Sequence, residues 1–431
     1  MSRKFFFTIT TRVAIILLAL FLYTPLTFGQ ELSLVKPESV GISSERLTRL
    51  DRVLKQYSDE KKIPGAVALV ARHGKVVYFK SFGMANIEAG IPMRNDSMFR
   101  IASMSKPITT TAVMMLYEEG HFLLNDPVSK FIPEFKDMKV IVPDSTGKSY
   151  TLVPAKGSIT IRHLLNHTSG ITYGSGLHAE FYKNDAGMIG GGLLTTKGAI
   201  GEMVKKLAAI PLISQPGEEF NYGLSIDVLG YLVEVVSGMP LNQFMEERIF
   251  KPLGMKDTYF TLPKEKLSRL ANFYVPNERG VIEKPSWDII GLNPSYLCTQ
   301  IYFSGGGGLI STAADYLKFA KMILNGGTFN GVRYLSRKTV EIMKTNSIGD
   351  LYTPYRMTNG DKFGYGFGIR NERGVYDEIE SLGIIGWKGY FNTNFWIDPK
   401  EDLIGIFMAQ TDDTTNIDTR FRVLVYQAIA D

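Results

Sequence analysis

The sequence Arg100-Ile101-Ala102-Ser103-Met104-Ser105-Lys106-Pro107 is the most informative part of the chain, because it places a Ser-x-x-Lys spacing at the start of an apolar helical run. A helix brings residues three apart onto one face, so Ser103 and Lys106 are expected to lie together. Pro107 fits the first helical turn, where amide groups have no helical partner. A serine hydroxyl becomes a nucleophile when a neighbouring base takes its proton, and a lysine can be that base. The pattern therefore predicts a nucleophilic Ser103 at a helix N-terminus, which supplies positive potential.

The Ser-x-x-Lys spacing on its own also occurs by chance, and Lys106 would then be a solvated lysine. Other signatures of hydrolases and nucleotide-binding proteins are missing from the sequence. It contains no Gly-x-Ser-x-Gly nucleophile motif and no Gly-x-x-x-x-Gly-Lys-Ser/Thr phosphate loop. The glycine run Gly305–Gly308 lacks the dinucleotide-binding spacing and indicates tight backbone packing before a helix near Ser311.

The composition predicts a folded protein with a large core. The chain has 431 residues, of which 45% are hydrophobic and 21% charged, and this excludes intrinsic disorder. Lys plus Arg number 48 and Asp plus Glu 43, a balance too even to indicate a nucleic-acid partner. The lone cysteine, Cys298, can form neither an internal disulfide nor a cysteine cluster for zinc or iron–sulfur. We expect no cofactor.

Residues 1–29 are predicted to be a secretory signal peptide. They contain a basic start, an apolar run over residues 13–22, and small residues before a cleavage point at Gln30. The run is much shorter than the ~20 apolar residues that a membrane-spanning helix needs, so we expect no stable membrane span after cleavage. An uncleaved anchor helix is the alternative. The signal predicts a secreted or periplasmic protein.

The order of the predicted elements indicates an α+β fold. A helix over 40–57 precedes a hairpin of strands 65–72 and 75–82, and further strands are expected at 365–370, 384–397 and 402–410. The expected helices between them, and the last helix, cover 103–119, 160–167, 225–237, 241–250, 312–324 and 415–429. Strands at both ends predict one antiparallel sheet built from both chain ends and flanked by helices. Within a single domain, 30–431, we expect an α/β part at about 40–105 and 310–431 and a mostly helical lobe at about 106–309.

The chain resembles the serine β-lactamase and penicillin-binding-protein family, and especially its class C-like branch of β-lactamases, esterases and D-amino-acid peptidases. The shared motifs, beyond residues 99–106, are Ile63-Pro64-Gly65-Ala66, Ile161–Gly170, Pro216–Tyr222, Pro252-Leu253-Gly254-Met255 and Gly306–Ala313. The resemblance covers roughly residues 40–430. It implies a β-lactamase/transpeptidase-like fold, with Ser103 as the nucleophile and Lys106 beside it.

The resemblance also implies a second catalytic element around Tyr222. Many members of the family have Tyr-x-Asn at this place, with the tyrosine acting as a base, and the chain reads Tyr222-Gly223-Leu224. An Asn would donate its amide to a substrate carbonyl, and Leu224 cannot. The absence of this Asn weakens the expectation that the protein recognises β-lactams. Leu224 itself is expected to be one of the substrate-binding residues.

The third element of β-lactamases, Lys-Thr/Ser-Gly, is represented by Trp387-Lys388-Gly389, as in esterase-like members of the family. All three residues are expected at the substrate-binding strand. By strand alternation, however, Lys388 faces away from Trp387 and does not replace the missing lysine. The amides of Tyr390 and Ser103 are expected to form the oxyanion hole.

Two histidines, His163 and His167, have the i, i+4 spacing that can bind zinc on one helix face. The Glu of His-Glu-x-x-His is missing and no third ligand is evident, so we expect no metal site. The resemblance makes this helix structural, with His167 capping or hydrogen-bonding near Thr168–Gly170. The loop over residues 169–193, rich in Gly and Ser, is expected to be mobile, and its role as a lid is left open.

The expected function is that of a secreted serine hydrolase that forms an acyl-enzyme on Ser103. With Trp387 and Leu224 in place, we expect an esterase or amidase acting on small or apolar acyl groups. One alternative is a class C-like β-lactamase or a D-alanyl-D-alanine carboxypeptidase acting on cell-wall peptides. Another is a penicillin-binding sensor that is acylated without turnover. The expected partners are small-molecule esters, amides or β-lactams.

Overall fold

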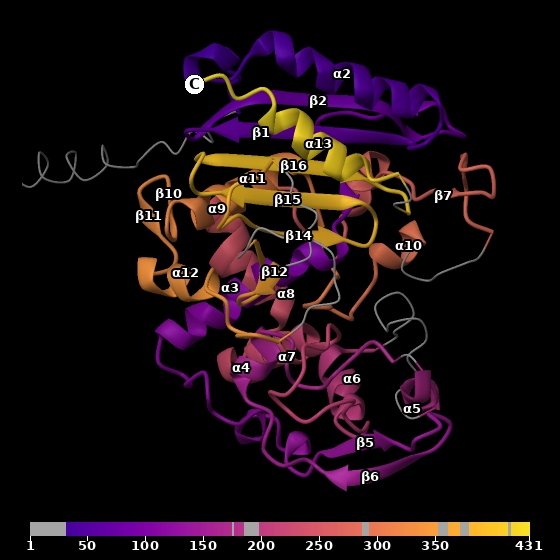
Figure 1. Ribbon diagram of the computed structural model, residues 1–431, viewed down its shortest axis with the longest axis vertical. Helices are drawn as coiled ribbons and strands as arrows, with labels where there is room; N and C mark the ends of the chain where they lie inside the picture. Colours follow the sequence, from indigo (N-terminus) through magenta and orange to yellow (C-terminus); the bar gives the residue numbers. More distant parts are fainter. Residues whose placement is uncertain are drawn as a thin grey trace, which may run out of the picture. The chain divides into compact units, whose positions relative to one another are not determined.

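Strands from the two ends of the chain lie side by side in the computed structural model, in one eight-stranded sheet (Figure 1). The structure describes residues 32–174, 176–184, 198–286, 293–351, 361–370, 379–412 and 415–431. Strand order is β12-β13-β14-β15-β16-β1-β2-β3, and every neighbouring pair is antiparallel. The prediction of an α+β fold with an antiparallel sheet from both chain ends is confirmed.

The sheet strands are β1 (Gly65–Arg72), β2 (Lys75–Asn86), β3 (Ile91–Pro92), β12 (Asp361–Phe363), β13 (Gly368–Arg370), β14 (Ile385–Gly389), β15 (Thr393–Asp398) and β16 (Leu403–Ala409). Smaller two-stranded ribbons are β4 (Phe99–Arg100) with β9 (Ile310–Ser311), β5 (Lys139–Pro143) with β6 (Tyr150–Pro154), β7 (Val275–Pro276) with β8 (Ile282–Glu283), and β10 (Thr328–Phe329) with β11 (Val332–Arg333).

The α-helices are α2 (Ser44–Asp59), α3 (Ser105–Glu118), α4 (Ile161–Leu165), α5 (Ala179–Asn184), α6 (Ile200–Leu207), α7 (Ser225–Ser237), α8 (Leu241–Met245), α9 (Lys251–Leu253), α10 (Pro294–Leu297), α11 (Ala313–Leu324), α12 (Arg337–Met343) and α13 (Ile417–Tyr426). The 3-10 turns are η1 (Pro37–Val40), η2 (Ala102–Met104), η3 (Val128–Lys130), η4 (Pro133–Phe135), η5 (Gly176–His178) and η7 (Lys264–Arg269), and η6 (Glu246–Phe250) is a π-helical turn.

The seam between β1 and β16 joins the two chain ends and is buried on both faces of the sheet. The pairing runs from Ala66 opposite Ala409 to Arg72 opposite Leu403. Helices α2 and α13 cover one face, in a core cluster that includes Trp396. On the other face, the ring of Tyr316 in α11 lies 4.7 Å from that of Phe395 in β15. Double-sided burial explains why these strands are continuous apolar runs rather than alternating patterns.

One predicted strand is wrong. Residues 384–397 form two strands, β14 and β15, joined by a tight turn rather than one continuous strand. Asn392 in that turn has a φ of 62°, the left-handed conformation that asparagine tolerates better than most residues. The aromatic residues around it have high strand propensity, so their pattern hides the turn. The predicted signal peptide, residues 1–29, and residues 185–193 of the predicted mobile loop lie outside the described residues.

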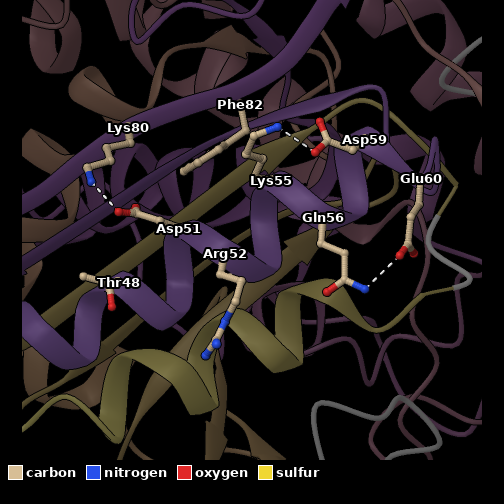
Figure 2. A pocket seen from close by; sticks show the side chains of 9 residues that line it. All are labelled: Thr48, Asp51, Arg52, Lys55, Gln56, Asp59, Glu60, Lys80 and Phe82. Carbon is tan, nitrogen blue, oxygen red and sulfur yellow. Dashed lines mark hydrogen bonds and ion pairs between the residues drawn. The ribbon is translucent and has the colours of Figure 1, made fainter.

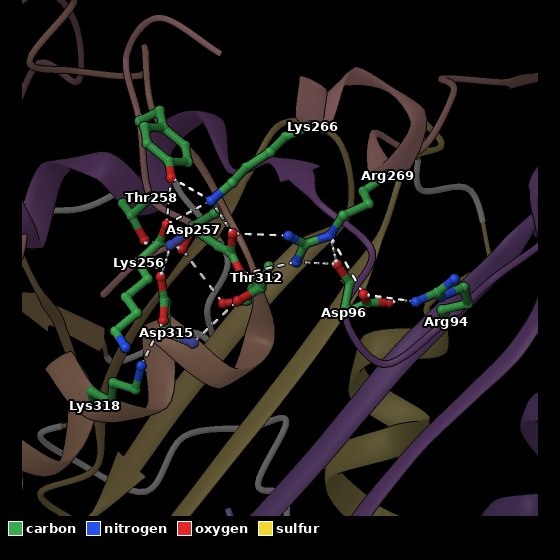
Figure 3. Close-up of polar contacts among 12 residues, drawn as sticks. Arg94, Asp96, Lys256, Asp257, Thr258, Lys266, Arg269, Thr312, Asp315 and Lys318 are labelled. Carbon is green, nitrogen blue, oxygen red and sulfur yellow. Dashed lines mark hydrogen bonds and ion pairs between the residues drawn. The ribbon is translucent and has the colours of Figure 1, made fainter. Parts of the chain in front are cut away.

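A network of ion pairs holds the short β4–β9 ribbon that leads to Ser103 (Figure 3). The guanidinium of Arg269 makes two bonds to the Asp257 carboxylate, each 2.9 Å, and also donates to the carbonyl of Asp96, just before β4. Asp315, in the first turn of α11, accepts the amide of Asp257. Burial raises the pKa of Asp257, but hydrogen bonds from Arg269 and Lys266 outweigh it and leave the pKa lowered. The network therefore connects the chain before β4 to the helix after β9.

Away from this region, an open groove between α2 and β2 carries mostly charged side chains (Figure 2). Four of its charged side chains form two ion pairs within the groove, Lys80 with Asp51 and Lys55 with Asp59. This groove contains none of the predicted site residues.

No helix in the described ranges has both the length and the apolar character of a membrane-spanning segment.

Candidate active site

Ser103 lies in the 3-10 turn η2, between strand β4 and helix α3. Its neighbour Ala102 has a φ of 43°, a conformation that costs a residue with a side chain energy and that concentrates at functional sites. Strand β4 fixes the turn from one side, since Arg100 pairs with Ile310 of β9. Helix α3 begins two residues later and is buried through most of its length. Ser103 itself is partly exposed, as a nucleophile that meets a substrate must be.

Lys106 is fully buried, and its ammonium group is held by three oxygens. The Nζ atom lies 3.1 Å from the Oγ of Ser103, 3.0 Å from the hydroxyl of Tyr173 and 2.7 Å from the carbonyl oxygen of Gly306. These contacts use the three donors that a lysine ammonium has. Ser103 and Lys106 therefore meet as predicted, with the lysine held in one orientation.

Tyr222 and Trp387 complete the constellation around Lys106. The Nζ of Lys106 lies 4.6 Å from the centroid of the Tyr222 ring. The indole Nε1 of Trp387 donates a 2.9 Å hydrogen bond to the Tyr222 hydroxyl, and the two rings lie 5.3 Å apart. A lysine charge and an indole N–H thus lie beside the same phenol. Both stabilise negative charge that develops on its oxygen.

Strand β14 approaches the turn that contains Ser103 at Gly389. A Cβ on this residue would lie 2.3 Å from the carbonyl oxygen of Ile101, so only a glycine allows so close an approach to η2. Tyr390 follows at the end of the strand, with a side chain 60% exposed. Its backbone is therefore next to the Ser103 turn, where the predicted oxyanion hole requires it. Phe391, one residue further, packs in a small apolar cluster that contains Ala102.

Two predicted substrate-binding residues do not present a free polar side chain to the site. Lys388 forms an ion pair with Asp418 of α13, on the face of the sheet opposite to Trp387, because successive side chains of a strand alternate. Leu224 is fully buried as the residue that precedes helix α7. Its side chain packs in the interior, so the substrate-binding role expected for these two residues is not supported by their placement.

The two histidines have different positions from those expected. His163, not His167, forms the helix cap: the Thr160 side chain accepts the His163 amide and the His163 ring accepts the Thr160 amide. His167 is fully buried with a φ of 59°, and its ring lies 4.7 Å from that of Tyr222. Neither ring nitrogen of His167 makes a hydrogen bond. Burial, and secondarily the charge of Lys106, lowers the pKa of His167 well below its usual value, so the ring is neutral.

Sequence reasoning missed two residues of the site. Tyr173, which bonds to Lys106, lies in the loop that was expected to be mobile, and its surroundings give no signal of a role. Asp227 is fully buried near Lys106, in the apolar first half of α7. That position did carry a signal, because an acidic residue on a buried helix face requires compensation. Within the described ranges, no group of three His, Cys, Asp or Glu side chains is placed to hold a metal ion.

Comparisons with known proteins identify the family of the chain. A family model described as Beta-lactamase matches residues 50–427. Esterase EstB of Burkholderia gladioli is 30% identical over 380 residues, covering 84% of this chain and 90% of the esterase. A putative D-alanyl-D-alanine carboxypeptidase of Escherichia coli K12 is 28% identical over 398 residues, covering 86% of this chain and 84% of that protein.

Among solved structures, the chain is similar to EstCE1, described as a hydrolase with promiscuous acyltransferase activity. The TM-score is 0.75 and the identity 28%, over 90% of this chain and 98% of EstCE1. This likeness confirms the predicted β-lactamase/transpeptidase-like fold. With a family match that spans most of its length, this chain belongs to the β-lactamase family.

Proposed function

We propose that the protein is a secreted serine hydrolase that works through an acyl-enzyme on Ser103, and that it cleaves esters or amides with small or apolar acyl groups. The observation that carries the proposal is the continuous set of contacts from Ser103 to Lys106, and from Lys106 and Trp387 to Tyr222. It supplies a nucleophile that is partly exposed, an adjacent buried cation and a candidate acid–base group within one cluster.

The reaction starts with attack of the Ser103 Oγ on the substrate carbonyl, as its proton passes to the Lys106–Tyr222 pair. The developing oxyanion takes hydrogen bonds from the amides of Ser103 and Tyr390, the donors expected for it. Tyr222 then returns the proton to the leaving alcohol or amine, and the carbonyl–leaving group bond breaks. Water, deprotonated by the same pair, then attacks the acyl carbonyl. The bond from this carbon to the Ser103 Oγ breaks, the pair returns the proton to the Oγ, and the carboxylic acid leaves.

The preference for esters rests on Trp387. In the position where β-lactamases of the resembling branch have a lysine, this chain has an aromatic ring whose single N–H is directed at Tyr222. No amide group stands at Leu224 to hold a β-lactam carbonyl, and the Ala102–Phe391 cluster next to the nucleophile is apolar. The relative EstB is named an esterase and EstCE1 a hydrolase, which supports this choice.

A peptidase acting on D-alanyl-D-alanine ends is the second candidate, supported by the Escherichia coli relative that is named a putative carboxypeptidase of that kind. A class C-like β-lactamase and a penicillin-binding sensor without turnover use the same Ser103 chemistry. The four candidates differ in which acyl-enzyme forms and whether it is hydrolysed.

The deciding experiment compares three substrates: a short-chain nitrophenyl ester, a chromogenic cephalosporin and a D-alanyl-D-alanine peptide. The mature chain and its Ser103→Ala variant are assayed together. Turnover of the ester alone, lost in Ser103→Ala, supports the proposal. Preferred cephalosporin or peptide turnover overturns the ester preference, and a stable adduct without turnover favours the sensor. N-terminal sequencing of exported protein, expected to begin at Gln30, tests secretion.

A further inference from the structure

Asp227 lies in the buried interior next to the catalytic lysine, and the mechanism described above does not use it. It comes from α7, which packs directly against the α3 helix that contains Lys106. The Asp227 side chain is 1% exposed. Its Oδ1 accepts a 2.6 Å hydrogen bond from Ser304 and a 3.1 Å hydrogen bond from the hydroxyl of Tyr302. Two donors on one oxygen favour the ionised carboxylate.

The backbone of Gly306 separates this carboxylate from Lys106. A Cβ on Gly306 would lie 2.3 Å from the Oδ2 of Asp227 and 3.6 Å from the Nζ of Lys106. The carbonyl of the same glycine accepts a hydrogen bond from Lys106. The two charged groups therefore approach each other as closely as they do because residue 306 has no side chain.

An ammonium group that is fully buried needs an opposite charge, since neutral oxygens only partly replace its hydration. The titratable groups that face Lys106 are Tyr173, Tyr222 and His167, and Asp227 is the carboxylate that accompanies them. Burial raises the pKa of Asp227, and this effect outweighs the Ser304 hydroxyl, the charge of Lys106, the Tyr302 hydroxyl and the Gly306 amide, which each act to lower it. The charges of Asp227 and Lys106 thus stabilise each other.

We propose that Asp227 is a positioning residue that acts through Gly306 as the counter-charge of Lys106 and keeps this lysine an ammonium ion. The role rests on the proposed hydrolase function. It follows that Tyr222 takes the proton from the Ser103 hydroxyl. Lys106 then supplies a fixed positive charge beside the Ser103 Oγ and the Tyr222 phenolic oxygen.

The test is the pH dependence of kcat for a short-chain nitrophenyl ester, measured with Asp227→Asn and the wild type. Asn keeps the shape and an acceptor oxygen for Ser304 but removes the charge. Without the negative charge of Asp227, the Lys106 ammonium is less stabilised. The pH above which kcat falls, its alkaline limit, is therefore expected to move down by about one pH unit or more. We expect kcat at neutral pH to fall at least about tenfold, with little change in KM.

Glu234→Gln is the matched control, because it removes a second carboxylate of α7, one that is partly buried. Its Oε1 accepts the amide of Leu241 at the start of α8 and touches no site residue named above. We expect the pH profile of this variant to match that of the wild type. If the alkaline limit of Asp227→Asn also matches the wild type, or if both variants shift it equally, the counter-charge role is wrong.

A second variant covers the case in which Asp227→Asn does not fold. Ser304→Ala removes one donor to the carboxylate and should shift the alkaline limit in the same direction but by less, and an unchanged profile would overturn the proposal. Ser103→Ala distinguishes a failure of the proposed hydrolase mechanism from a failure of the counter-charge role of Asp227. If it retains full turnover, the hydrolase mechanism fails; if only the Asp227 profile is unchanged, the mechanism stands and the inference fails.

Discussion

The indole nitrogen of Trp387 donates a 2.9 Å hydrogen bond to the phenolic oxygen of Tyr222. The bond connects strand β14, near the end of the chain, to the turn that precedes α7. It therefore connects the sheet to the helical part of the protein at Tyr222, the residue proposed to transfer protons. A neutral donor here assists Tyr222 without adding charge, which suits a neutral ester better than a substrate that brings a carboxylate.

Trp387→Phe tests that bond, because it keeps an aromatic ring and removes the N–H. We expect kcat to fall about 10- to 100-fold, the range for loss of a hydrogen bond to a group that becomes charged, with KM changed little. Steady-state kinetics on a nitrophenyl ester measures both constants. Trp396→Phe, in the core on the opposite face of the sheet, is the matched control and should leave kcat near the wild-type value. Equal losses in the two variants would refute the role of the Trp387 bond.

Tyr173 is expected to hold Lys106 rather than to react. Tyr173→Phe removes one of the three acceptors of the lysine ammonium, so kcat should fall roughly tenfold while the fold is kept. Tyr182→Phe removes a phenol that bonds to Thr172 in the same segment and serves as the comparison. A Tyr173→Phe variant with wild-type kcat would show that the contact has no part in catalysis.

Gly389→Ala should separate β14 from the Ser103 turn. The added Cβ meets the Ile101 carbonyl oxygen at 2.3 Å and the Thr393 hydroxyl at 2.2 Å, so the strand must move and take the Tyr390 amide with it. Loss of one oxyanion donor costs about 100- to 1000-fold in kcat. Gly157→Ala, where a Cβ meets nothing within 4 Å, is the control. Activity of Gly389→Ala equal to that of Gly157→Ala would contradict the predicted oxyanion hole.

His167 should make the fold less stable at mildly acidic pH. Burial lowers its pKa in the folded state, so below the unfolded value of about 6.5 the unfolded chain binds more protons than the folded chain. Stability is therefore full above pH 6.5 and is lost as the pH falls below it, by about 1 kcal/mol between pH 7.5 and 5.5. Urea unfolding at the two pH values measures this loss. His167→Asn, which tolerates the left-handed backbone, should depend less on pH, and an unchanged difference would exclude His167 as the cause.

The sequence was sufficient to predict the architecture and the local contact between Ser103 and Lys106. Periodicity and chain-end strands predicted the antiparallel sheet, and the Ser-x-x-Lys spacing predicted the contact between Ser103 and Lys106 because that contact is local. A tight turn inside the sheet and a contact between distant segments were harder to predict. The turn at Asn392 was hidden by aromatic residues of high strand propensity, and only the folded chain brings Tyr173 to Lys106 from a loop.

The alternation of side chains along a strand explains why the orientation of Lys388 could be predicted from the sequence. A residue adjacent to Trp387 on a strand must face the other side, where Asp418 of α13 meets it. Asp227 could have been suspected from its acidic side chain in an apolar helix. Its proximity to Lys106 could not have been predicted, because Lys106 and the intervening Gly306 come from segments far away in the sequence.

The most direct test of the central claim is to trap the acyl-enzyme. Mature protein is mixed with a slowly hydrolysed nitrophenyl ester, quenched in acid, and digested for peptide mass spectrometry. The account predicts one acyl group per chain, on the Oγ of Ser103, that is absent from Ser103→Ala together with turnover. An acyl group on another residue, such as Ser105, or a Ser103→Ala variant that hydrolyses the ester at the wild-type rate, would contradict it.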